Sequence, residues 1–214
     1  MKKGFDQKHT AVYYNRFSNV YDLVSSKSYY HKARTRAVAE LHLEQGKTVL
    51  NVPVGTGQNF EYFQKYLLGS GVILAVDLSN GMLDKAKKKV IENRWSNVTL
   101  VNMDVLAIDS NLIHRFTNQS GVDAVLCDLG LTAFPDWKAA IDKLISLLLP
   151  KGRLVIMDWY LEKASIRRSF INWIGKAEID RPLWKYMEPR VNDFSLDTSF
   201  NRGGVFVASG TKPG

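Results

Sequence analysis

TVLNVPVGTGQNF, residues 48–60, is the stretch that predicts the fold of this chain. It opens with TVLNV, a short apolar run of the kind found in buried strands. The turn that follows contains Gly55 and Gly57, and a helical pattern begins near Gln58. Glycine lets a backbone approach a ligand without a Cβ in the way, and free N–H groups at a helix start attract anions. The stretch therefore predicts a strand, a ligand-binding turn and a helix.

The same order of strand and helix continues along the chain. Further short apolar runs lie at 72–77, 98–103, 122–128 and 153–159, and helical patterns lie near 58–68, 80–93 and 136–149. Such runs are typical of strands buried on both faces, and their alternation with helices predicts a parallel sheet covered on both sides. The runs FSLDTSF and GGVFVASG, separated by a glycine-rich turn, predict a C-terminal antiparallel hairpin.

Two acidic residues follow the next two predicted strands. Ligands of a parallel sheet lie at the carboxyl ends of its strands. Asp77 ends the second strand, where an acidic side chain can accept both hydroxyls of a ribose. Asp104 follows the third strand and could accept from an adenine amino group, with Val105 against the ring. These positions predict an adenosine ligand that bears a small charged group.

The order of these motifs resembles the class I S-adenosylmethionine-dependent methyltransferases. The resemblance covers about residues 45–160 and rests on VLNVPVGTG, ILAVDLSNGML, VTLVNMDV, VDAVLCDLGL and LLLPKGRLVIMD, closed by the hairpin. It implies an α/β fold, with a Rossmann-like, seven-stranded, mostly parallel sheet, helices on both faces and a C-terminal antiparallel hairpin. It also implies S-adenosyl-L-methionine as cofactor and S-adenosyl-L-homocysteine as product.

The resemblance further implies roles for single residues. The glycines of the first turn would face the methionine part of the cofactor, the acid of the second strand the ribose, and the acid after the third strand the adenine. The residues after the fourth strand would line the floor beside the methyl group. The cofactor-binding residues expected in this way are Asn51, Pro53, Gly55, Thr56, Gly57, Asn59, Asp77, Leu78, Met82, Asp104, Val105, Asp128 and Leu129.

Two residues of the first turn depart from the family pattern, which is usually an acidic residue, any residue and then glycine. Asn51 keeps the size of an aspartate and one acceptor but loses its charge. Pro53 fixes φ and removes an N–H. We expect a variant turn that still binds the cofactor. The alternative from another class is a non-catalytic protein that binds S-adenosylmethionine or S-adenosylhomocysteine.

The 214 residues are expected to form a single methyltransferase domain, 1–214. Within it we expect an N-terminal helical cover at 1–44, the cofactor-binding core at 45–160, a helical lid at 161–192 and the terminal hairpin at 193–214. The segment at 161–192 is rich in basic and aromatic residues, so it is either a lid or a contact with an anionic membrane surface.

The catalytic group is not identified by the sequence. Transfer from a sulfonium mainly needs a positioned nucleophile and exclusion of water, so no single catalytic residue is required. Candidates are Tyr13, Tyr21, His31 and Asp128, of which the tyrosines could face an ammonium headgroup. No metal site is expected, because the four histidines are scattered and Cys127 is the only cysteine.

The acceptor is expected to be small or lipophilic. FSNVYDLVSS and the GTGQN loop resemble bacterial phospholipid and betaine-lipid N-methyltransferases, and DLSNGML resembles the ubiquinone and menaquinone C-methyltransferases. We prefer a lipid headgroup amine, with a quinone or another small C- or O-methylated molecule as the alternative. A net charge of +8 is compatible with nucleic acid, but the fourth strand lacks the turn typical of base amino-methyltransferases, so nucleic acid is not the expected partner. The oligomeric state stays open.

The location of the chain is expected to be cytoplasmic. Its start has two lysines but no apolar run behind them, and one cysteine allows no internal disulfide. The basic and aromatic segments add the expectation of a peripheral contact on the inner face of the membrane.

Overall fold

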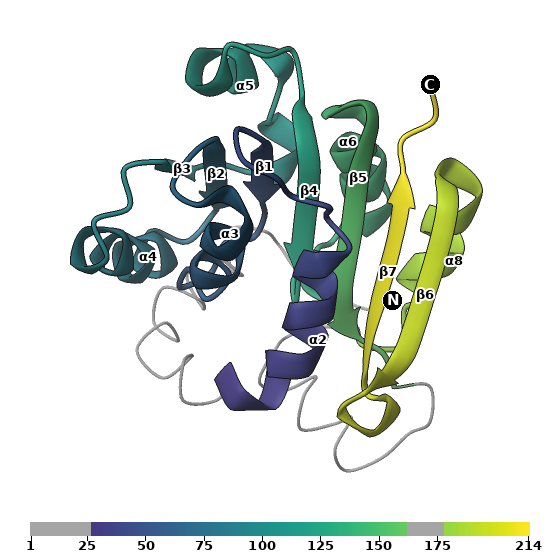
Figure 1. The fold of residues 1–214 in the computed structure, drawn as a ribbon. Coiled ribbons are helices and arrows are strands. Elements are labelled where there is room, and N and C mark those ends of the chain that lie inside the picture. Colours follow the sequence, from purple (N-terminus) through teal and green to yellow (C-terminus); the bar gives the residue numbers. More distant parts are fainter. Residues whose placement is uncertain (1–26, 162–177) are drawn as a thin grey trace.

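A computed structural model describes residues 27–161 and 178–214 of the chain. Its centre is one seven-stranded sheet in the order β3-β2-β1-β4-β5-β7-β6 (Figure 1). The strands are β1 Thr48–Asn51, β2 Val72–Asp77, β3 Val98–Asn102, β4 Val122–Asp128, β5 Leu148–Trp159, β6 Asn192–Phe200 and β7 Val205–Thr211. The α-helices are α2 Lys27–Ala39, α3 Phe60–Leu67, α4 Asn80–Glu92, α5 Ser110–Thr117, α6 Trp137–Ser146 and α8 Leu183–Met187.

The pairing of the strands confirms the predicted fold class. β1 pairs in parallel with β2 and β4, β2 with β3, and β4 with β5. β7 is antiparallel to both β5 and β6, which gives the terminal hairpin. The strand order reverses at β1, because the chain runs outward through β2 and β3 and then returns to β4. In open α/β sheets the crevice beside such a switch point is where ligands bind.

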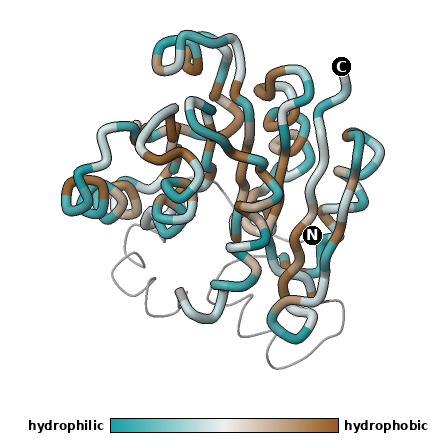
Figure 2. Tube along the Cα trace, viewed as in Figure 1, coloured by the Kyte–Doolittle hydropathy of each residue, from teal (hydrophilic) through white to brown (hydrophobic). Residues whose placement is uncertain are grey.

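Side chains alternate along the strands and feed two hydrophobic cores, one on each face of the sheet. Val49 and Ile73 join the core beneath α2, α3 and α4, whereas their neighbours Leu50 and Leu74 join the core beneath α5, α6 and α8. Figure 2 shows the apolar residues concentrated along the central strands, with polar residues more frequent on the helices. The fold therefore has three layers, with the sheet between two layers of helices.

Three local expectations need correction. β3 is not buried on both faces: its residues are half-buried or exposed because it is an edge of the sheet. β5 begins at Leu148 rather than near 153 and includes Pro150 and Gly152, with a register shift against β4 at this end. The amphipathic helix α5 was not predicted, since its polar caps resemble a loop in the sequence.

Helix α2 is tied to the sheet at both ends. Near its start, Nε1 of Trp159 donates to the hydroxyl of Tyr30 at 2.9 Å. Just past its end, the Glu40 carboxylate accepts from Nη2 of Arg153 at 3.0 Å and from the Ser209 hydroxyl at 2.6 Å. Contacts at both ends fix the position of the helix over β5 and β7, and so fix where its side chains reach.

Two expectations lie outside the described residues. Tyr13 and Tyr21 fall in 1–26, and half of the basic aromatic segment at 161–192 falls in 162–177. The division into cover, core, lid and hairpin stays a prediction. Within the described residues no helix is long and apolar enough to cross a membrane.

Candidate functional site

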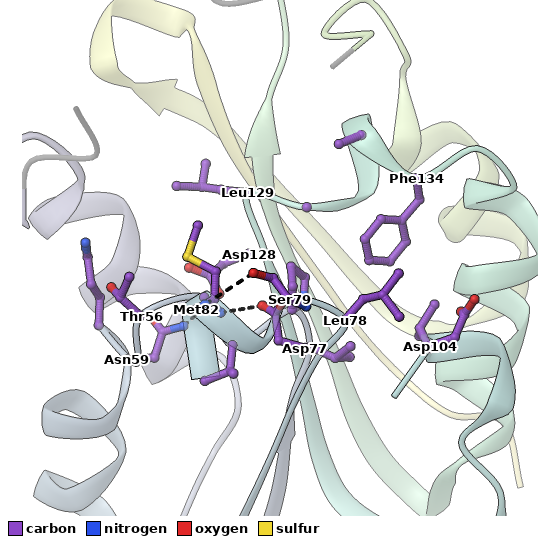
Figure 3. Close-up of a pocket in the computed structure, with 18 of the residues that line it drawn as sticks. Thr56, Asn59, Asp77, Leu78, Ser79, Met82, Asp104, Asp128, Leu129 and Phe134 are labelled. Carbon is purple, nitrogen blue, oxygen red and sulfur yellow. Dashed lines mark hydrogen bonds between the residues drawn. The ribbon is translucent and has the colours of Figure 1, made fainter. Parts of the chain in front are cut away.

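A cavity opens at the carboxyl ends of β1, β2 and β4. All the predicted cofactor-binding residues line it except Asn51 and Gly57. Figure 3 shows it as an elongated hollow, with Thr56 and Asn59 at one end, Phe134 and Asp104 at the other, and Asp77 between them. The strand ends that the sequence singled out therefore meet at one place, beside the switch point of the sheet.

The two glycines of the first turn, Gly55 and Gly57, leave space for different groups. Gly55 has φ +55° and a Cβ there would meet nothing within 4 Å, so its bare backbone faces open cavity. A Cβ on Gly57 would instead lie 2.5 Å from the ring of Phe60. Gly55 thus leaves room for a ligand, as predicted for both, whereas Gly57 leaves room for the first side chain of α3.

Asp77 organises the centre of the cavity. Its carboxylate accepts the backbone N–H of Gly55 at 2.8 Å and that of Ser79 at 2.9 Å. Burial raises the pKa of Asp77 from 3.8 to about 6, against the effect of these hydrogen bonds. Ser79 in turn caps α4 by accepting from the N–H of Met82 at 3.2 Å. The acid joins the glycine turn to the start of α4, and each oxygen keeps capacity to accept a hydroxyl.

One end of the cavity is mainly apolar. Leu78 and Phe134 line it, with Asp104 at its edge (Figure 3). Val105, which follows Asp104 in the chain, also lines the cavity. The Asp104 carboxylate accepts from the N–H of Leu106 at 2.9 Å, which orients it at the start of a 3₁₀ turn. A flat apolar ring with amino groups at its rim suits this combination of apolar walls and one acceptor. Phe134 was missed, because nothing in the sequence separates it from the core aromatics.

The other end of the cavity is a buried polar cluster. The Asp128 carboxylate at the end of β4 accepts from Nδ2 of Asn59 at 2.7 Å and from Nδ2 of Asn51 at 3.3 Å. Its second oxygen lies 3.3 Å from Nη2 of Arg34. Asn59 is the N-cap residue of α3 but makes no capping hydrogen bond, since its side chain is used in this cluster. Asn51 therefore donates a hydrogen bond that helps to orient Asp128, but Asn51 does not line the cavity itself.

Arg34 also lines the cavity, and we did not predict it although the sequence contains a signal for it. In α2 the buried residues recur at helical spacing: Tyr30, Ala33, Ala37 and Val38. Arg34 lies within that apolar stripe, is 3% exposed and lines the cavity. A charged side chain in a core stripe needs a partner, and here the partners are Asp128 and Gln58, whose Oε1 accepts from Nη1 at 2.9 Å.

His31, a predicted catalytic candidate, does not line the cavity. Its side chain is exposed, and Nδ1 lies 2.8 Å from the hydroxyl of Tyr62 on α3. Of the candidates within the described residues, Asp128 alone lines the cavity. The described residues contain no group of histidine, cysteine and acidic side chains that could hold a metal ion.

The cavity fits the cofactor that the sequence resemblance implied. Adenine matches the apolar end, ribose hydroxyls match the acceptors of Asp77, and a charged tail matches the polar cluster. Two buried polar atoms of that cluster, Nε of Arg34 and Oδ1 of Asn59, have no hydrogen-bond partner within the described residues. Buried polar groups are almost always paired in folded proteins, so these atoms indicate a polar ligand at this end.

Comparison with known proteins agrees with the fold and the sequence motifs. Residues 49–152 match the model of a methyltransferase domain. The demethylmenaquinone methyltransferase of Lactiplantibacillus plantarum is 26% identical over 145 residues, which are 68% of this chain and 57% of that protein. The chain thus spans just over half the length of the curated relatives it matches.

Solved structures share the architecture at low sequence identity. The N-methyltransferase NodS from Bradyrhizobium japonicum, in complex with S-adenosylhomocysteine, superposes with a TM-score of 0.72 at 13% identity, over 96% of this chain and 99% of that one. Phosphoethanolamine N-methyltransferase 2 from Haemonchus contortus, in complex with S-adenosylmethionine, gives 0.68 at 12% identity, over 86% and 53%. These likenesses show that the chain shares the fold of solved S-adenosylmethionine-dependent methyltransferases, in agreement with the methyltransferase-domain match at residues 49–152.

Proposed function

We propose that this chain binds S-adenosylmethionine and transfers its methyl group to a small or lipophilic acceptor, with a lipid headgroup amine as the preferred acceptor. One observation carries the proposal: a single cavity joins an apolar end, the Asp77 carboxylate and a buried charged cluster in the order of adenine, ribose and amino-acid tail. The departures at Asn51 and Pro53 do not close this cavity, since Pro53 lines it.

The residues of the cavity would hold the cofactor as follows. Asp77 accepts the ribose hydroxyls, and Leu78, Val105 and Phe134 enclose the adenine. Asp104 accepts from the adenine amino group. The bare backbone of Gly55 allows the charged tail to pass over the turn toward the polar cluster.

For methyl transfer the protein mainly has to position the acceptor next to the methyl group and exclude water from the site. S-adenosylmethionine supplies a methyl group on a sulfonium; when the acceptor lone pair bonds to that carbon, the carbon–sulfur bond breaks and S-adenosylhomocysteine remains. An amine acceptor must be neutral to attack and loses one proton after transfer. Because no metal is needed for such a displacement, a site formed by apolar walls and oriented polar groups is sufficient.

The preferred acceptor, a lipid amine, is supported by charge. The chain carries +8, which favours association with an anionic phosphate-bearing surface. The second candidate, a quinone ring carbon, is supported by the 26% identity to a demethylmenaquinone methyltransferase over 145 residues. Both acceptors are lipophilic, so both would be presented from a membrane.

A parallel assay separates the two candidates. The protein is incubated with methyl-labelled S-adenosylmethionine and vesicles that contain either phosphatidylethanolamine or a reduced demethylmenaquinone, and label in the lipid extract is counted. Asp77→Ala, which is expected to bind the cofactor more weakly, should transfer less label at a limiting cofactor concentration. Asp109→Asn is the matched control, since Asp109 caps α5 and does not line the cavity. Label in phosphatidylethanolamine would support a lipid headgroup amine as the acceptor. Label in the quinone alone would refute that preference and support the quinone ring carbon.

Calorimetric titration with S-adenosylhomocysteine completes the test. Binding without label transfer to any lipid, quinone or amine extract would favour the non-catalytic alternative. Absence of binding would refute the proposed function altogether.

A further inference from the structure

The segment that follows β4, residues 129–135, forms one wall of the cavity, and we call it the wall segment. Two of its residues, Leu131 and Thr132, are buried at 0% and 1% exposure and do not line the cavity. The conformation of the wall segment therefore depends on contacts made outside the cavity. The members that do line the cavity are Leu129, Gly130, Ala133, Phe134 and Pro135.

The middle of the wall segment is held by Asp158, near the end of β5. The Asp158 carboxylate accepts from the backbone N–H of Thr132 at 3.1 Å and from its hydroxyl at 2.9 Å. Asp158 is 0% exposed and does not line the cavity. These two hydrogen bonds fix Thr132 against the sheet, but neither of them reaches Phe134, two residues further along the chain.

Phe134 is held by Arg181, in the chain just before α8. Nη1 of Arg181 donates to the carbonyl oxygen of Phe134 at 2.6 Å. Nε and Nη2 of the same guanidinium lie 3.2 Å and 3.1 Å from Oε2 of Glu178, which fixes its direction. The backbone N–H of Glu178 in turn donates to the carbonyl oxygen of Thr132 at 2.8 Å. The Arg181 side chain is 15% exposed and does not line the cavity.

The place of the Phe134 ring depends on this outer contact, because the turn itself is short. The wall segment contains a single 3₁₀ turn, Leu131–Ala133, and such turns have poor hydrogen-bond geometry. A hydrogen bond from a charged donor is stronger than one between neutral groups. If a wall occupies its binding position for only a fraction of the time, the dissociation constant of the ligand rises by the inverse of that fraction.

Resting on the function proposed above, we propose that Arg181 is a positioning residue for the cofactor, which holds Phe134 where its ring encloses the adenine. Arg181 acts through Phe134, since it does not line the cavity itself. It also lies outside residues 49–152, which match the methyltransferase domain, so the domain match assigns it no role.

Arg181→Met tests the role by calorimetry with S-adenosylhomocysteine. The variant removes the donors but keeps an unbranched side chain, and Asp158 still holds Thr132, so the fold should persist. A displaced ring loses the same contact as a missing one, so the dissociation constant should rise by roughly 3- to 10-fold, as for Phe134→Ala. Arg181→Lys keeps a cationic donor for the Phe134 carbonyl and should recover part of the loss.

The matched control is Arg190→Met. Arg190 also donates to one backbone carbonyl, that of Tyr186 at 2.8 Å, and to one carboxylate, that of Asp142 at 3.0 Å. Both of these partners lie outside the wall segment. Loss of this arginine should therefore leave the affinity for S-adenosylhomocysteine within about twofold of the wild type.

Two further readouts separate positioning from a general loss of stability. In a chain that already carries Phe134→Ala, Arg181→Met should change the affinity by less than about twofold, because no ring remains to be placed. The second readout needs no ligand. The N–H groups of Ala133 and Phe134 donate to Gly130 and Leu131 at 2.9 Å and 3.1 Å, and their hydrogen exchange should be faster in Arg181→Met but not in Arg190→Met.

The outcomes distinguish this role from the proposed function. An unchanged affinity in Arg181→Met, or an equal loss with and without the Phe134 ring, would overturn the positioning role and leave the proposed function intact. Exchange that is not faster in Arg181→Met would show that Arg181 does not hold the wall segment, and would overturn it as well. A wild type that binds no S-adenosylhomocysteine would refute the proposed function and the role in cofactor binding together.

Discussion

Replacement of Gly130 by alanine should destabilise the protein through a clash with one particular residue, Pro53. A Cβ on Gly130 would lie 2.4 Å from Cδ and 2.5 Å from Cγ of the Pro53 ring. Carbon atoms in contact prefer separations of about 3.5–4.0 Å, so one of the two chain segments would have to move by about 1 Å. A pyrrolidine ring cannot rotate out of the way, which leaves the backbone to absorb the shift.

The magnitude follows from two opposing effects. Overpacking of this kind costs about 1–3 kcal/mol in the free energy of unfolding. Gly130 has φ −131° and ψ −42°, which alanine adopts without a left-handed conformation. Alanine there should therefore recover about 0.4–1 kcal/mol by restricting the unfolded chain. The clash outweighs the gain, and we expect a net destabilisation of about 1–2 kcal/mol.

A double-mutant cycle isolates the clash. With Pro53→Gly in place, Gly130→Ala should become neutral or slightly stabilising, so the two changes should couple by about 1–3 kcal/mol. Urea unfolding, followed by far-ultraviolet circular dichroism, measures each corner of the cycle. Pro135→Gly is the matched control, because Pro135 also lines the cavity but contributes none of the three atoms nearest to that Cβ. Additivity within about 0.5 kcal/mol for the Pro53 pair would refute the reasoning.

Further variants test the site and its pH dependence. Asp77→Ala should lower the affinity for S-adenosylhomocysteine by roughly tenfold or more, since the ribose loses its acceptor; unchanged affinity in calorimetry would refute this placement. Because burial raises the pKa of Asp77 to about 6, the affinity of the wild type should rise as the pH rises through 6 and the carboxylate ionises; a flat profile from pH 5 to 7.5 would contradict it. Burial likewise raises the pKa of Asp158 from 3.8 to about 6, so the folded state holds a proton that the unfolded state releases, and this stability is lost as the pH rises through 6. Asp158→Asn should therefore reduce the loss of unfolding free energy between pH 5 and 7.5 by about 1.4 kcal/mol in urea titrations, and an unreduced loss would exclude Asp158 as its source. Phe134→Ala should weaken adenosine and S-adenosylhomocysteine alike, by roughly 3- to 10-fold, and an effect on only one of them would argue against an adenine contact.

The sheet and the strand-end residues were predictable because they depend on local patterns. Asp77 and Asp104 each directly follow a recognisable apolar run, and parallel strands bring their carboxyl ends to one edge. The exposure of β3 was not predictable, since an edge strand and a central strand of the same apolar composition differ only in their neighbours. Strand order is a property of the whole fold, and no single run encodes it.

The polar cluster was only half predictable for a similar reason. Asp128 follows a strand, but Arg34 reaches it from a helix 94 positions away in the sequence. That approach depends on how α2 is tied to β5 and β7 by Trp159 and Glu40. A charged residue inside an apolar helical stripe was the one signal available, and it indicates a buried partner without identifying which one. His31, on the same helix, was the histidine that we named as a catalytic candidate, but its side chain contacts the hydroxyl of Tyr62 instead.

The two unusual residues of the first turn and the segment after β4 are best understood together. β1 and β4 are neighbours in the sheet, so the residues at the end of β1 lie beside the residues at the end of β4. Asn51 contacts Asp128, and Pro53 lies against Gly130. A neutral side chain at 51 lies against a carboxylate at 128, and a ring at 53 lies against a glycine at 130. The charge that Asn51 lacks is present on Asp128, and the space that the Pro53 ring needs is left by the missing side chain of Gly130. A turn that had merely lost its function would have no reason to keep such matched partners, so the pairing favours a site that still binds its cofactor.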